Sequence, residues 1–304
     1  MAGTIWVKAA VGAGFGLIRR RPVAMLAWGA VMTLAFGLVA AAYAWWITNM
    51  FAAGAGQRLG AHTSPGQTTA LFGVMIAGEG AFFLAIIGMT FLQTIVTTAV
   101  WRAVVHPEQG RWAYLRVGMA ELFVFLIKVA VQFLANFAML PLMPFLIIVG
   151  VLLGFHQYAA AAVVGVLMIF AIVSAVVYVE LRFALLGPMI VDDGEFHFLE
   201  AWRLSRGKVG RLLLTGLSLV GVLFAAEAII LVLTFTTGAA VLSLAAGGLD
   251  NLQAFFQKGP QWVAGRLWPL VAVWAIAAIP VAGSLSAIMA APWARAYRDA
   301  ASQA

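Results

Sequence analysis

Three ionisable residues stand inside long apolar runs of the chain: Glu79, Lys128 and Glu227. A charged side chain at the centre of a membrane helix costs about 2.5–3.5 kcal/mol on insertion scales, so each should face neighbouring helices and have a partner. We therefore predict an ion pair between Lys128 and either Glu79 or Glu227. Such a pair would be able to relay protons or ions, or to form the floor of a substrate cavity. Alternatively, it would hold helices in register at a net energy near zero.

Lys128 belongs to a polar stripe on one helix face. Gln132 and Asn136 follow it at four-residue steps, and Glu121 precedes it by two turns. Residues at this spacing lie above one another on a helix, so the stripe should face other helices and not lipid. The predicted intramembrane polar cluster consists of Glu79, Lys128, Gln132, Asn136 and Glu227.

Catalytic and metal-binding motifs are missing from the sequence. It has no H-E-x-x-H, no G-x-S-x-G and no P-loop. Cysteine is absent, which excludes disulfides, thiolate catalysis and Cys-ligated zinc. The histidines fall in loops or near interfaces, and no two of them have the spacing of metal ligands. We expect no catalytic residues, no metal and no cofactor, and a membrane enzyme acting on lipid is the weakest of three functional interpretations.

The longest polar interruption of the apolar sequence, from Leu181 to Leu212, predicts a second candidate site. Asp193 is suited to cap a helix start and Gly207 to end a helix, so we predict a surface helix between them. Phe198 and Trp202 would share one face of this helix. The helix would either dock anionic lipid or a partner protein, or serve as a connector whose arginines fix its orientation. The predicted cytoplasmic basic surface consists of Arg203, Arg206, Lys208 and Arg211.

The composition identifies lipid as the solvent of this chain. Of 304 residues, 64% are apolar and only 10% are charged, whereas about 25% are charged in a soluble domain. We predict an all-α, polytopic integral membrane protein, with residues 1–304 forming a single transmembrane domain. Its six transmembrane helices should form three hairpins, with short interfacial helices on the cytoplasmic side. The expected spans are approximately 22–46, 69–101, 117–153, 159–179, 212–237 and 267–291.

The third of these runs is too long for one straight helix across a hydrocarbon core about 30 Å thick. Pro141 and Pro144 should bend or break it. We predict a single crossing with a kinked or re-entrant outer part near these prolines, followed by a tight outer turn near His156. A double crossing would place the basic residues between Leu181 and Leu212 on the outer side, against the usual charge bias.

The distribution of basic residues predicts the sidedness of the chain, because lysine and arginine are enriched in cytoplasmic loops. Of the 18 basic residues, only Arg58, Lys258 and Arg266 fall on the outer side of the six-span arrangement, and Lys128 falls within a span. Both termini should therefore be cytoplasmic, in a bacterial inner (plasma) membrane. The net charge of +7 follows from this topology and does not indicate nucleic-acid binding.

A weak internal repeat is present. At three places a short segment typical of a membrane surface is followed by a basic turn and then by a predicted span. These spans begin at Pro22, Val117 and Leu212. The repeating unit would be a surface helix followed by a helical hairpin. Alternatively, the inner ends of all membrane helices look alike, because basic and aromatic residues gather there.

Several inner-loop motifs resemble those of a known family. They are FGLIRRRP at Phe15–Pro22, WRAVVHPEQGRWAYLR at Trp101–Arg116, E-x-R-F-x-x-x-x-P-M-I-V-x-x-G from Glu180 to Gly194, and AWRLSRGK at Ala201–Lys208. They resemble the six-span bacterial membrane proteins related to the membrane domain found beside glycerophosphoryl diester phosphodiesterases. The resemblance covers most of the chain and implies a fold more than an activity. No polar stretch of the sequence is long enough for a phosphodiesterase domain, so the resemblance does not imply phosphodiesterase activity for this chain.

Two classes of function fit these observations best. The first is a non-enzymatic inner-membrane protein that binds lipid or a partner membrane protein in assembly or envelope upkeep. The alternative is a transporter of a small or amphiphilic solute, with Glu79, Lys128 and Glu227 lining its path. The first predicts bound lipids or partners, and the second predicts a continuous water-accessible cavity.

Overall fold

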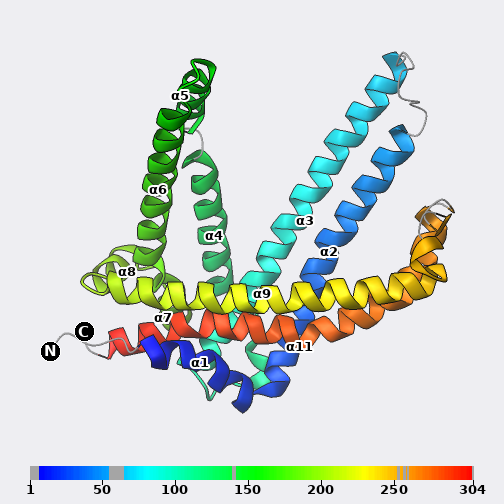
Figure 1. Ribbon diagram of the computed structural model, residues 1–304. Helices are drawn as coiled ribbons and strands as arrows, with labels where there is room; N and C mark the ends of the chain where they lie inside the picture. Colours follow the sequence, from blue (N-terminus) through cyan, green and yellow to red (C-terminus); the bar gives the residue numbers. More distant parts are fainter. Residues whose placement is uncertain are drawn as a thin grey trace. The chain divides into compact units, whose positions relative to one another are not determined.

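The computed structural model describes residues 7–54, 65–138, 142–251, 254–255, 258 and 260–302. These residues form helices joined by short turns, and no strand occurs among them, which confirms the predicted all-α class. The helices are α1 (Val7–Arg20), α2 (Pro22–Gly54), α3 (Pro65–Val105), η1 (Arg111–Tyr114), α4 (Met119–Ala138), α5 (Leu142–Gly154), α6 (Tyr158–Phe183), α7 (Leu186–Asp193), α8 (Phe198–Leu204), α9 (Val209–Ala246), η2 (Leu249–Asn251) and α11 (Pro260–Ala301) (Figure 1).

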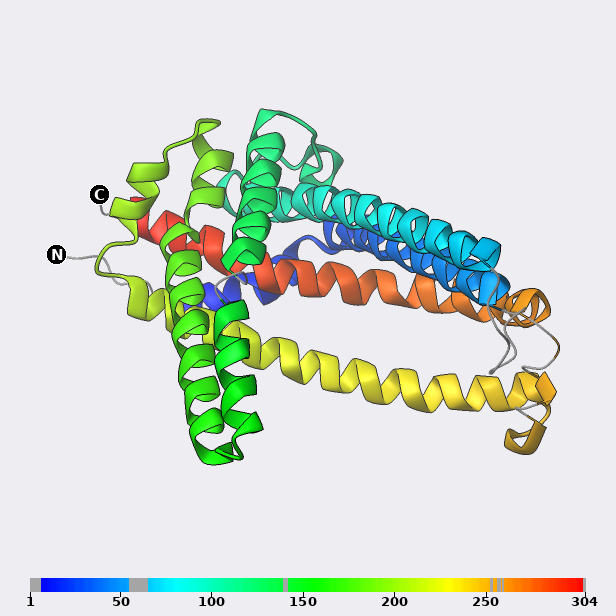
Figure 2. The ribbon, with the colours of Figure 1, turned by 90° about the horizontal axis from the view of Figure 1, so that it is seen from above.

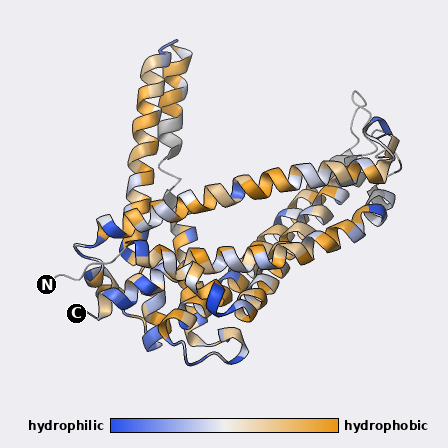
Figure 3. Cartoon of the chain, turned by 60° about the horizontal axis from the view of Figure 1, so that its bottom comes forward, coloured by the Kyte–Doolittle hydropathy of each residue, from blue (hydrophilic) through white to orange (hydrophobic). Residues whose placement is uncertain are grey.

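Five helices in the described part of the chain are long and apolar enough to cross a membrane. Their most apolar stretches have mean hydropathies from 1.9 to 2.8, and the shortest of the five spans has 29 residues. At 1.5 Å per residue, each exceeds a hydrocarbon core about 30 Å thick. Hydrophobic residues, coloured orange, recur along these helices (Figure 3). The five spans are Pro22–Met50, Phe72–Val105, Tyr158–Asp193, Val209–Ala246 and Gly265–Ala301.

The third predicted run, 117–153, is divided between two helices. Helix α4 ends at Ala138 and α5 begins at Leu142, and Pro141 lies outside the described residues. Pro144 lies in the first turn of α5, where proline does not remove an intrahelical hydrogen bond. Neither α4 nor α5 is among the five candidate spans.

A tight turn at His156 joins α5 to α6, as the sequence predicts. The amide of Gln157 donates to the carbonyl of Leu152 (2.8 Å), and that of His156 donates to Leu153 (3.0 Å). This pair of bonds is the Schellman arrangement, which needs a left-handed residue at the position of His156. His156 has φ = 58° accordingly. The turn lets α5 and α6 run side by side in opposite directions (Figures 1 and 2).

Replacement of His156 by glycine should therefore stabilise the protein by about 0.5–1 kcal/mol, because glycine adopts the left-handed conformation without a steric penalty. The measurement is thermal unfolding of the detergent-solubilised protein. His156→Ala is the control, since it removes the imidazole, which lies 2.9 Å from the Tyr158 hydroxyl, but keeps the backbone strain. A glycine variant no more stable than the alanine variant would contradict the prediction.

The contacts divide the chain into two compact units. The first unit comprises Met1–Leu17, Thr97–Leu217 and Ala290–Ala304, and the second comprises Ile18–Val96 and Ser218–Met289. The prediction of one transmembrane domain over the whole chain stays a prediction.

In the first unit, aromatic rings attach α8 to the end of α6. Phe183 at the end of α6 stacks on Phe198 with ring centroids 4.4 Å apart, and Trp202 lies 5.4 Å from the same ring. The predicted shared face of Phe198 and Trp202 is thereby confirmed.

The start predicted for α8 is wrong. Asp193 ends α7 and does not cap α8, because Gly194 adopts a left-handed conformation (φ = 76°) and closes α7 through a bond to the Ile190 carbonyl (2.9 Å). Helix α8 begins only at Phe198, after His197, which makes no side-chain capping bond.

In the second unit, two glycines allow close helix contacts. Gly78 on α3 lies so near Trp46 on α2 that a Cβ atom built on it would be 1.7 Å from the indole Cδ1. The helices α2 and α3 run side by side in both views (Figures 1 and 2). Gly29 on α2 similarly meets the backbone of α11. Small residues at such crossings are typical of packed membrane helices.

Candidate functional site

A buried ion pair joins the end of α3 to the start of α4 in the first unit. Arg102 Nη2 contacts Glu121 Oε1, and their side chains are only 6% and 2% exposed. Arg102 also donates through Nη1 to the main-chain carbonyl of Tyr114 (2.7 Å). Glu121 lies in the first turn of α4, where the helix dipole favours a negative charge. The pair therefore holds two helix ends and the turn between them together.

The turn between these helices, η1, has an unusual backbone. Trp112, Ala113 and Tyr114 have φ values of 54°, 56° and 63°, and a left-handed residue other than glycine costs about 1–2 kcal/mol. Tyr114 is buried, and its hydroxyl donates to the Pro107 carbonyl (2.9 Å). Trp112, in contrast, is 78% exposed. The bonds of Tyr114 and Arg102 thus hold a strained turn in one shape.

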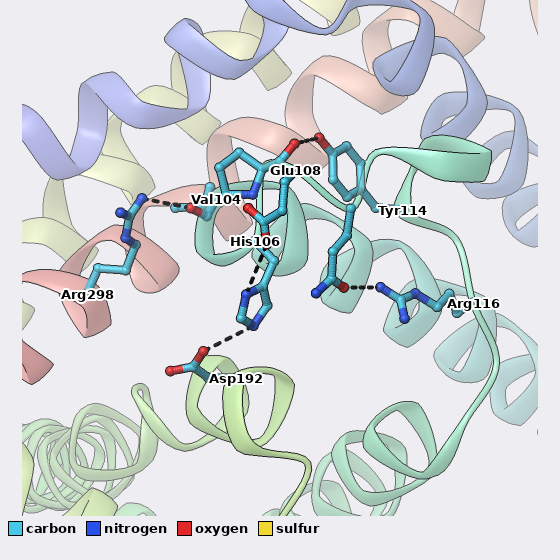
Figure 4. A network of polar contacts seen from close by, with 9 residues as sticks. Val104, His106, Glu108, Tyr114, Arg116, Asp192 and Arg298 are labelled. Atoms are coloured by element: carbon cyan, nitrogen blue, oxygen red, sulfur yellow. Dashed lines mark hydrogen bonds and ion pairs between the residues drawn. The ribbon is translucent and has the colours of Figure 1, made fainter.

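His106, at the end of α3, connects this region to α7. Its Nε2 lies 3.1 Å from Asp192 Oδ1, and its Nδ1 lies 3.6 Å from Glu108 Oε1 (Figure 4). Tyr297 near the end of α11 donates to the other oxygen of Asp192 (2.8 Å). Arg298 donates to the Val104 carbonyl (3.0 Å), as Figure 4 also shows. The network joins α3, α7 and the end of α11.

The network contains one imidazole, two carboxylates, one phenol and one guanidinium. No group of three or more His, Asp or Glu residues that could hold a metal ion occurs in the described part of the chain. The contacts of the network connect the ends of three helices.

Trp101 fills the space between the same three helices. Its indole Nε1 donates to the Ala290 carbonyl on α11 (3.0 Å). Its ring lies against Gly187 on α7, where an added Cβ atom would be 2.3 Å from the ring. The residue pair Trp101–Arg102 thus anchors the end of α3 on one side to α7 and α11 and on the other to α4.

The basic residues predicted as a surface lie at the α8–α9 turn. Arg203, Arg206 and Arg211 are exposed, and Lys208 is partly buried, which lowers its pKa. Leu199, 68% exposed, lies on the same face of α8 as Arg203. An apolar and a basic side chain thus lie together on one exposed face of α8.

Arg182 fixes the orientation of α8. Its guanidinium carbon lies 4.6 Å from the centre of the Trp202 ring and 5.2 Å from that of Tyr178. Two of its nitrogens donate to the Tyr178 hydroxyl (3.0 and 2.8 Å). Trp202 is thereby held toward α6, while Leu199 and Arg203 of α8 remain exposed.

The predicted intramembrane cluster is divided between the two units. Lys128 belongs to the first unit, where its amine donates to Thr97 Oγ1 (3.2 Å), while Gln132 is exposed and the side chain of Asn136 lies outside the described part. Glu79 and Glu227 belong to the second unit and are exposed within it. The ion pair of Lys128 with either of them stays a prediction.

Sequence reasoning missed the pairing of Arg102 with Glu121 and that of His106 with Asp192. The signals were present, since Trp101–Arg102 ends a span and Glu121 stands in a polar stripe. Arg102 was interpreted only as a topology signal, and no pattern linked it to an acid on the next helix. Comparisons with protein-family models, curated proteins and solved structures find no match, so the family resemblance of the inner loops stays a prediction.

Proposed function

We propose that this chain is a non-enzymatic, six-span integral protein of a bacterial inner membrane that binds anionic lipid headgroups at its cytoplasmic surface, in assembly or envelope upkeep. The observation that carries the proposal is the exposed face formed by α8 and the turn that follows it. Leu199 on this face would enter the headgroup layer, and Arg203 and Arg206 would pair with phosphates. The Arg182–Trp202 contact fixes the orientation of α8, so little ordering is needed on binding.

The lengths of α4, α5 and α6 support a sixth crossing. Helix α6 has 26 residues and is therefore about 39 Å long, whereas α5 has 13 residues and is about 20 Å long. From the turn at His156, α5 covers only the outer half of α6, and α4, with 20 residues, supplies the length to return to the inner side. The third crossing would thus be α4 and α5 together, broken near the prolines.

The contacts of two arginines support a repeated hairpin unit. Arg102 ends a span and donates to Tyr114 in the surface segment that precedes α4. Arg182 ends another span and stacks on Trp202 in the surface helix that precedes α9. In both cases the arginine at the end of one hairpin holds the segment that leads into the next. With α1 before α2, the proposed arrangement has three hairpins, each preceded by a surface segment.

A charge-removing variant tests lipid binding. The double variant Arg203→Gln, Arg206→Gln should bind a fluorescent phosphatidylglycerol roughly 30-fold more weakly than the parent protein, since each basic residue near a surface contributes about 1 kcal/mol. The measurement is a titration of the detergent-solubilised protein at low salt. Lys258→Gln with Arg266→Gln is the control, because it removes the same charge at the predicted outer side and should change affinity little. Equal losses in both variants would indicate attraction by net charge only and would contradict a site on α8.

The second candidate function, transport, is favoured by the surroundings of Lys128. A hydroxyl partner does not neutralise the amine, so the charge on α4 could assist an anionic solute. In that case Lys128→Met should abolish solute flux in proteoliposomes while leaving the thermal stability of the protein unchanged. A stable variant with unchanged flux, or a parent protein without any flux, would exclude this function.

A further inference from the structure

We propose that the η1 turn is a second, preformed membrane anchor, which places Trp112 among the lipid headgroups and binds lipid phosphate with Arg111 and Arg116. This anchor involves residues other than those of α8 and does not depend on lipid binding there. It would attach the loop between α3 and α4 to the cytoplasmic leaflet.

The exposed side chains of the turn are those that a membrane interface accommodates. Trp112 is 78% exposed, and Val117 and Met119, which follow it, are 72% and 61% exposed. Leu122 and Leu126 are also exposed and continue from Met119 along one stripe of α4. The stripe runs into an apolar segment of the chain, so its natural covering is lipid. Trp112 then lies where an aromatic ring with one polar edge is preferred, at the water-facing end of such a stripe.

The charge of the turn fits phosphate. Arg111 and Arg116 are exposed, and no acidic residue stands between Gln109 and Gly118. Glu108 contacts His106, and Glu121 is buried against Arg102, so the ion-pair contacts of these two acids are with other residues than Arg111 and Arg116. A surface with a tryptophan and two unopposed arginines complements an anionic headgroup layer.

Side-chain contacts hold the left-handed backbone of the turn in one conformation. The three strained residues keep their shape because the Tyr114 carbonyl accepts a bond from Arg102 and the Tyr114 ring is buried beneath the turn. Arg116 is oriented by a contact with Gln109. Backbone strain of this kind persists only where surrounding contacts over-determine it. Here it keeps Trp112 outward before any lipid is bound, which lowers the entropic cost of binding.

A chain without cysteine allows a direct test by site-directed spin labelling. The full-length protein carries a nitroxide at Trp112→Cys, or at Val117→Cys with Trp112 retained, in nanodiscs of phosphatidylcholine with or without phosphatidylglycerol. The readout is the ratio of collision rates with oxygen and with a water-soluble nickel complex. We expect this ratio to be severalfold higher at both positions than at the control, Ser302→Cys, near the exposed end of α11. Phosphatidylglycerol should raise it further.

Three further outcomes decide the proposal. Arg102→Lys keeps a positive charge opposite Glu121 but removes the second guanidinium nitrogen, which donates to the Tyr114 carbonyl. This variant should therefore increase the mobility of the spin label at position 117. Arg203→Gln with Arg206→Gln should leave the label depth unchanged, which separates this anchor from the α8 surface. Labels as accessible to nickel as the Ser302 control would overturn the proposal. Protection in native membranes but not in nanodiscs would also overturn it, in favour of a protein partner.

Discussion

Replacement of Glu121 by glutamine should lower the free energy of unfolding by about 3–5 kcal/mol, the usual cost of removing one partner from a buried ion pair. The guanidinium of Arg102 is almost fully covered, so the variant would leave a buried charge without its counter-ion. Arg102 also holds the strained η1 turn through the Tyr114 carbonyl, and its displacement would release that turn. The measurement is thermal or denaturant unfolding of the protein in detergent micelles.

A double variant separates charge from packing. Arg102→Met combined with Glu121→Leu removes both charges, so it should recover part of the stability lost in Glu121→Gln. A deficit of about 1–3 kcal/mol should remain, because the Tyr114 carbonyl loses its donor. Glu200→Gln on the exposed surface of α8 is the matched control and should change stability by less than about 0.5 kcal/mol. If Glu121→Gln behaves like this control, the pair does not carry the stability assigned to it.

The ion pair illustrates which contacts a sequence can predict. The positions of the long helices follow from apolar length, whereas the start predicted for α8 at Asp193 missed the local effect of Gly194, which ends α7. The shared face of Phe198 and Trp202 follows from helix periodicity alone. The partner of Arg102 depends instead on how the chain turns between α3 and α4. Three successive left-handed residues with side chains are not expected from any local preference, so neither the turn nor the pair across it was predictable.

Lys128 shows a similar limit. Its place in a polar stripe was evident, and the stripe correctly marked Glu121 as a residue turned toward other helices. However, the most buried member of that stripe pairs with an arginine at the end of a helix, and not with the lysine two turns away. The positions of charged residues within an apolar run identify the side chains that need a partner of opposite charge. Several such partners are chemically equivalent, and only the three-dimensional arrangement of the helices decides which one is used.

Substitution of Gly29 by alanine should be among the most damaging single-methyl changes in this protein. A Cβ atom at Gly29 would lie 1.8 Å from the carbonyl oxygen of Ile279 on α11. The contact is reciprocal, since a Cβ atom at Gly283 would lie 2.0 Å from the carbonyl oxygen of Met25 on α2. Both obstacles are backbone atoms, which cannot rotate away as a side chain would. Either alanine must therefore separate the two helices, at a cost at or above the usual 1–3 kcal/mol for overpacking.

Matched controls exist on both helices. Gly37 on α2 and Gly265 on α11 have no atom within 4 Å of an added Cβ, so alanine there should be neutral or stabilising by up to about 1 kcal/mol. The measurement is the thermal midpoint of each variant in detergent, together with the fraction that elutes as folded protein. Gly29→Ala and Gly283→Ala together should cost less than the sum of the two single changes, because one separation of the helices relieves both clashes. Full additivity, or a Gly29→Ala variant as stable as Gly37→Ala, would show that the two backbones do not touch at this crossing.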